Sequence, residues 1–96
     1  MTVFIAKLQI KPGKEADLER LQTELSALTH AREPDTLVYD VLRSRDEPGT
    51  YIVYGRFKDE AAFQLHQTTD FHTRLVPPIV ACLAKEFEIA FYDFVA

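Results

Sequence analysis

Apolar side chains alternate with other side chains through residues 3–11, where every second residue from Phe4 to Ile10 is apolar. This period of two predicts a β-strand with one buried face. A Pro-Gly pair then predicts a turn. From position 14 to about 30 the apolar period lengthens to three or four residues, which predicts an amphipathic helix. Its apolar stripe consists of Leu18, Leu21, Leu25 and Leu28.

Two more strand patterns follow at residues 36–43 and 51–57, and the turn sequence Asp-Glu-Pro-Gly lies between them. The second pattern is rich in β-branched and aromatic residues, as strands usually are. Together the two segments predict an antiparallel hairpin. In the first of them we expect Leu37, Tyr39 and Val41 on one face, and Val38, Asp40 and Leu42 on the other.

The last third of the chain predicts helical pieces and a final strand. Asp59 suits the N-cap of a short helix through about position 67, and Thr69 or Asp70 suits the cap of another turn over 71–75. The Pro77-Pro78 pair is expected to restart the chain, with a further helical piece through position 84. Residues 87–94 predict the last strand.

The resulting order is β-α-β-β-α-β, which is the ferredoxin-like arrangement of an α+β domain. We expect one domain over residues 1–96, because the chain is too short for two cores. An open sheet face should be polar, yet several strands carry large apolar groups on both faces. In the third strand, for example, Ile52 and Tyr54 oppose Tyr51 and Val53. A homodimer that covers this face is therefore expected.

The composition of the chain argues against several classes of function. Hydrophobic residues make up 47% of the chain, which is enough for a core, and the net charge is −4 without any basic stripe, which argues against binding to nucleic acid. The single cysteine, Cys82, lies among apolar residues and is expected to be buried. No signal peptide pattern opens the sequence and no apolar run is long enough for a membrane, so a cytoplasmic protein is the expectation.

Several stretches of the chain resemble the antibiotic biosynthesis monooxygenase family, in the branch of quinol monooxygenases and phosphorylated-autoinducer isomerases. They are Glu33 to Val41, Asp46 to Gly49, Tyr51 to Tyr54, Lys58 to Phe63, His66 and Phe71. The resemblance implies a homodimeric α+β barrel that oxidises a quinol or a polyketide aromatic with molecular oxygen and without a metal or flavin cofactor. Gly55 stands where many members have Glu, and Phe57 stands where many have Trp. The haem-degrading branch is disfavoured, because Ala6 replaces its Asn and the chain has no Trp.

His66 is the first candidate for a catalytic residue. It lies three residues after Phe63 in the predicted helix, so both side chains should face the core. A histidine there can accept a proton from a phenolic hydroxyl near neutral pH, and the phenolate transfers an electron to oxygen more readily than the phenol. The alternative is a half-buried histidine hydrogen-bonded to the backbone.

Tyr54 and Arg56 share one face of the third strand, where they could orient an oxyanion. Their alternative role is cross-strand packing and a surface ion pair. For substrate binding the candidates are Tyr39, Phe63, Phe71 and His72. His30 suits the negative end of the first helix and is interpreted as structural.

Three functions remain open at this point. The first is the cofactor-independent monooxygenase, and the second is an isomerase that enolises a small dicarbonyl, in some cases a phosphorylated one. The third is a dimeric module that binds an apolar ligand without catalysis. The three histidines and the lone cysteine lack the spacing of metal ligands, and no phosphate loop or nucleophile elbow is present.

Overall fold

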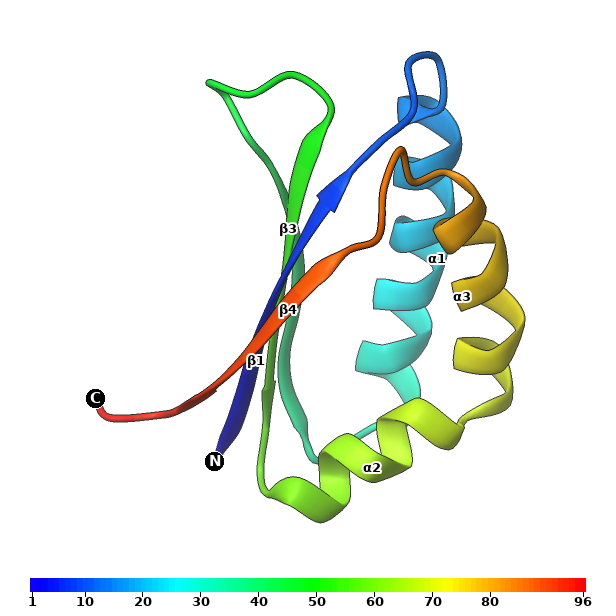
Figure 1. The fold of residues 1–96 in the computed structure, drawn as a ribbon. Coiled ribbons are helices and arrows are strands. Elements are labelled where there is room, and N and C mark those ends of the chain that lie inside the picture. The colour runs from blue at the N-terminus through cyan, green and yellow to red at the C-terminus, as the bar shows by residue number, and fades with distance from the viewer.

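A computed structural model describes residues 1–96 as a four-stranded antiparallel sheet with helices on one face (Figure 1). The strands lie in the order β2-β3-β1-β4, so the ferredoxin-like α+β order is confirmed. The bounds are β1 Thr2–Gln9, α1 Glu15–Arg32, β2 Thr36–Arg43, β3 Thr50–Phe57, α2 Glu60–Thr68, α3 Asp70–Ala81 and β4 Glu88–Asp93.

The hairpin of β2 and β3 is also confirmed, although its register contains an irregularity. Thr36 pairs with Phe57 and Val38 pairs with the preceding residue of β3, so Leu37 is an extra residue in β2. Leu37 is consequently exposed, whereas Tyr39 is buried. The expectation that Leu37 shares a face with Tyr39 and Val41 is therefore wrong, because a bulge breaks the alternation of side chains.

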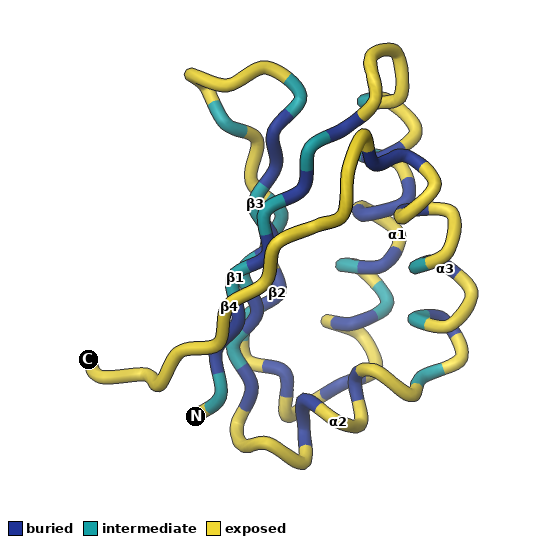
Figure 2. The backbone as a smooth tube through the Cα atoms, in the orientation of Figure 1, coloured by how far each residue is buried: buried dark blue, intermediate teal, exposed yellow.

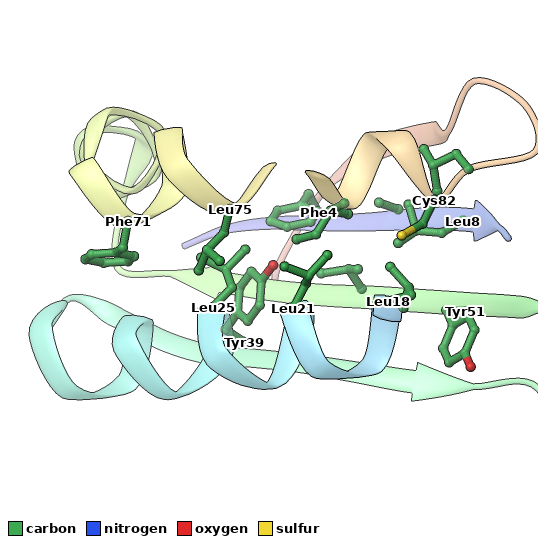
Figure 3. Close-up of a cluster of buried hydrophobic side chains, with 14 of the residues drawn as sticks. Phe4, Leu8, Leu18, Leu21, Leu25, Tyr39, Tyr51, Phe71, Leu75 and Cys82 are labelled. Carbon is green, nitrogen blue, oxygen red and sulfur yellow. The ribbon is translucent and has the colours of Figure 1, made fainter. Parts of the chain in front are cut away.

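The core lies between the sheet and the helices. Leu18, Leu21 and Leu25 of α1 point toward the sheet, and Figure 3 shows Tyr39 reaching from β2 to these leucines. The buried face of β1 is the predicted one, from Phe4 to Ile10. Cys82 is buried and has a free thiol, as expected.

The second helical region is divided where the sequence predicted. The Asp59 carboxylate accepts a hydrogen bond from the Ala62 backbone at 2.9 Å, and Thr69 caps α3. However, the expected restart at Pro77-Pro78 is wrong, because α3 continues through both prolines to Ala81. Pro77 and Pro78 lie on the exposed side of α3, so the carbonyls that lose their N–H donors face solvent.

The sheet face opposite the helices is open in Figure 1, and every residue of β4 is exposed, as Figure 2 shows. Large apolar side chains are consequently left in contact with solvent at this edge: Phe87, Ile89, Phe91, Tyr92 and Phe94. None of the helices has the length and apolar character that crossing a membrane would require.

Candidate active site

A cavity of about 170 Å³ lies between the helix-covered face of the sheet and α3. Most of its wall is hydrophobic, and the contributing side chains include Phe4, Phe63, Val76, Ile79, Phe87 and Ile89. The polar residues in the wall are Gln22, Tyr39, His66, Gln67 and His72. An apolar hollow with a few polar groups is the usual form of a small-molecule site.

His66 is the most deeply buried of these polar residues, with 3% of its surface exposed. Its Nδ1 lies 2.9 Å from Oε1 and 3.1 Å from Oε2 of Glu33. The Thr36 hydroxyl donates to the same carboxylate at 2.8 Å. With an ionised Glu33, Nδ1 carries the proton and donates it, which leaves the lone pair on Nε2. Nε2 has no hydrogen-bond partner in the protein, so it can accept a proton from a ligand in the cavity.

Glu33 is a functional candidate that the sequence analysis missed. It is the C-cap residue of α1, and its backbone N–H donates to the Thr29 carbonyl. A carboxylate at this end of a helix is disfavoured by the helix dipole. This local conflict was the available signal, because residues that violate a local preference are often functional.

Burial lowers the pKa of His66, and the attraction of Glu33 opposes that effect. The pKa of His72 is lowered too, first by burial and then by His66, again against the effect of Glu33. The two histidine rings meet edge to face with centroids 4.9 Å apart. Both imidazoles are therefore neutral at pH 7, which is the form that a general base needs.

Tyr39 lies beside His66, and hydrogen bonds fix both its hydroxyl and its backbone carbonyl. Its ring centroid lies 5.3 Å from that of His66, and its hydroxyl donates to Oε1 of Gln22 at 3.2 Å. Ser26 and His30 of α1 both bond the Tyr39 backbone carbonyl at 3.1 Å. Burial raises the pKa of Tyr39 well above its usual range, so the hydroxyl stays protonated.

The other predicted site residues divide into two groups. Phe63 and His72 line the cavity with His66 and Tyr39, whereas Phe71 is buried in the core and is not part of the cavity wall. Tyr54 and Arg56 alternate with the buried residues of β3, so they lie on the opposite face of the sheet. The Arg56 guanidinium stacks on Phe94 of β4, 4.5 Å from the ring centroid. The expectation that they share a pocket with His66 is therefore not met within one chain.

Gly55 explains how the Phe4 ring fits into the cavity wall. These two residues pair across β3 and β1, and a Cβ atom on Gly55 would lie 2.4 Å from Cε2 of Phe4. The Phe4 ring occupies the space that any side chain at position 55 would need. No three His, Cys, Asp or Glu side chains are grouped as metal ligands.

The family model of the antibiotic biosynthesis monooxygenases matches residues 1–77. The chain belongs to this family. It is similar to the crystal structure of a provisionally assigned antibiotic biosynthesis monooxygenase of Caulobacter crescentus CB15, with 29% identity, 99% of this chain and 90% of that chain covered, and a TM-score of 0.95. A second crystal structure of an antibiotic biosynthesis monooxygenase is 32% identical with a TM-score of 0.91, and both chains are covered completely.

More distant structures share the fold alone. A provisionally assigned member from Nitrosomonas europaea covers both chains completely with a TM-score of 0.93 at 20% identity. No curated protein matches the chain. Membership of the family supports a monooxygenase-type role, and the substrate has to be inferred from the cavity.

Proposed function

We propose that the protein is a cofactor-independent monooxygenase that oxidises a quinol-like or polyketide aromatic with molecular oxygen. The observation that carries this proposal is the buried pair of Glu33 and His66 in the wall of an apolar cavity. Glu33 fixes the orientation of the imidazole and stabilises the imidazolium, as the carboxylate does in catalytic triads. His66 accepts the phenolic proton at Nε2.

The phenolate is then the reductant. It transfers electrons to oxygen, one oxygen atom bonds to a ring carbon, and the other leaves as water. For a hydroquinone this gives a hydroxyquinone and water, so the substrate supplies all four electrons that oxygen takes up. The hydrophobic wall favours a flat ring.

Both alternatives from the sequence are less well supported. A phosphorylated substrate needs cationic or backbone donors, and neither lysine nor arginine lines the cavity. A module that only binds an apolar ligand would have no need of the buried Glu33–His66 pair, and the cavity disfavours a module with a fully packed interior. Enolisation of an uncharged dicarbonyl uses the same base, and it is tested by following proton exchange at the substrate carbon with NMR.

A homodimer forms part of the proposal. The open face of the sheet carries Ile52 and Tyr54, and the β4 edge adds the exposed rings of Tyr92 and Phe94. A second copy on this face would bury them. It would also place Tyr54 and Arg56 at the subunit interface, where they retain a structural role.

The test is oxygen uptake with quinols of one, two and three rings, including reduced menadione and an anthrone. Uptake above the uncatalysed rate is expected for the wild type and should be lost in His66→Ala. Because that variant leaves Glu33 buried without a partner, His66→Gln is the second variant, since it keeps a hydrogen bond to the carboxylate but accepts no proton. Gln64→Ala, on the exposed side of α2, is the control. Wild-type uptake no faster than the uncatalysed reaction would overturn the proposal.

A further inference from the structure

One polar side chain interrupts the apolar stripe of α1. Gln22 lies between Leu18 and Leu25 at helical spacing, and it is as buried as they are, with 4% of its surface exposed. Its amide has two N–H donors and one oxygen. The protein satisfies only the oxygen, through the Tyr39 hydroxyl at 3.2 Å. Nε2 makes no hydrogen bond within the protein, but it is not completely enclosed, so its two donors are available to solvent or to a ligand in the adjoining hollow.

Gln22 borders the same cavity as the proposed base, His66. His66 packs on the ring of Tyr39, and Gln22 meets the hydroxyl at the far end of that side chain. Tyr39 therefore contacts both groups, His66 through its ring and Gln22 through its hydroxyl. A second hollow, a groove with several polar residues, lies between α1 and β2. Gln22 borders both this groove and the cavity, and it is the residue that the two share.

The size of the cavity fits one aromatic ring. Apolar cavities of about 150 Å³ in proteins hold benzene, and this one measures about 170 Å³. A ring that lies along Tyr39 with a hydroxyl at His66 would place an oxygen on its opposite carbon near the Gln22 amide.

We propose that Gln22 is a specificity-determining residue, which selects single-ring phenols carrying a second oxygen opposite the hydroxyl that His66 binds. Nε2 of Gln22 donates to that second oxygen, while the Tyr39 hydroxyl holds Oε1 and so fixes the amide. This inference rests on the proposed function for the position of the first hydroxyl. It adds the chemical class of the ring and its polar contact.

The experiment measures binding without oxygen, so turnover is not involved. Hydroquinone and 4-methylphenol have nearly the same shape and differ in the second oxygen, and their dissociation constants are measured by NMR titration under argon. The wild type should bind hydroquinone about tenfold more tightly, which is the usual effect of one satisfied buried hydrogen bond. In Gln22→Met, which keeps the shape but has no donor, the preference should disappear.

A second variant and a control keep the result interpretable. Gln22→Glu still accepts from Tyr39 and can accept from the ligand hydroxyl, so it should retain a preference for hydroquinone even if Gln22→Met is unstable. Thr23→Ala changes the next residue, which lines the groove and not the cavity, and it should behave like the wild type.

Failure of this inference can be told apart from failure of the proposed function. It is overturned if the wild type binds neither ligand or shows no preference, if Gln22→Met keeps the preference, or if a three-ring phenol binds as tightly as hydroquinone. If the preference is present and no quinol drives oxygen uptake, the role of Gln22 stands and the monooxygenase proposal fails.

Discussion

Nδ1 of His66 lies 2.9 Å from Oε1 of Glu33, although 33 residues separate the two in the chain. The pair joins the C-cap residue of α1 to the last turn of α2, and both side chains are almost fully buried. A buried carboxylate with a histidine on one side and a threonine hydroxyl on the other is costly to assemble. The fold nevertheless contains this unfavourable buried pair, and it lies at the wall of the apolar cavity.

Replacing Glu33 by Gln should preserve the volume and remove the charge. The imidazole then loses the group that fixes its tautomer and stabilises its protonated form, so oxygen uptake should fall by about a hundredfold or more. The pKa of His66 should also fall further, because Glu33 is the group that raises it. An NMR titration of the histidine ring protons measures this shift. Glu24→Gln, which removes an exposed partner of Arg74, should leave uptake and titration unchanged.

The stability of the protein should decrease below about pH 6.5, the ordinary pKa of a histidine. His66 and His72 have lowered pKa values in the folded state, so below pH 6.5 the unfolded chain binds more protons than the folded chain. The free energy of unfolding therefore rises with pH through this window and is retained above it. Urea unfolding at pH 7.5, 6.5 and 5.5 measures the slope. His72→Gln should reduce the slope, and a stability that is constant over this range would contradict the assignment.

The sequence could identify His66, Phe63 and Tyr39 because helix and strand periodicity place their side chains on the core side of the fold. His72 lies six residues after His66, which is not a same-face spacing on one helix, so periodicity did not predict its place in the cavity. The sequence could not identify the partners of these residues. Helical spacing places Gln22 on the buried stripe of α1, but it does not show that Tyr39 is its partner. The contact of Glu33 with His66 is a tertiary contact without a local period. Tyr54 is predicted to act with His66 because its hydroxyl could orient an oxyanion, but the alternation within β3 turns its side chain to the other face of the sheet.

The prediction of the fold failed where backbone chemistry departs from the usual rules. Pro77 and Pro78 normally end a helix, but Leu75 and Ile79 continue the buried stripe of α3 on its opposite side. The two prolines have no N–H, so two backbone hydrogen bonds of α3 are lost. This loss costs little because the unpaired carbonyls face water, and burial of the apolar stripe outweighs it. Leu37 was misplaced for a similar reason, since a bulge is not visible in a hydrophobic pattern.

The Gly55→Ala substitution should destabilise the protein by about 1–3 kcal/mol, as overpacking of a core usually does. The new Cβ would lie within 3.0 Å of three atoms of the Phe4 ring. That ring cannot easily move away, because it packs against both Phe57 and Phe63. Urea unfolding of the wild type, Gly55→Ala, Phe4→Leu and the double variant forms a thermodynamic cycle. If the decreases in the free energy of unfolding caused by the two single substitutions simply add in the double variant, contact with the Phe4 ring is not the reason for glycine at position 55.

The homodimer should depend on the open face of the sheet and not on the helices. Ile52 is half-buried there in the single chain, next to Tyr54 and opposite Lys7 of β1. Ile52→Glu would place a carboxylate in the proposed interface, and dimerisation would have to remove both it and the neighbouring Lys7 from water, which is unfavourable. Gel filtration with light scattering at low micromolar concentration should give a dimer for the wild type and a monomer for this variant. The control is Leu65→Glu, an equally apolar position exposed on α2. It should remain dimeric, and a monomeric wild type would remove the explanation for the apolar open face.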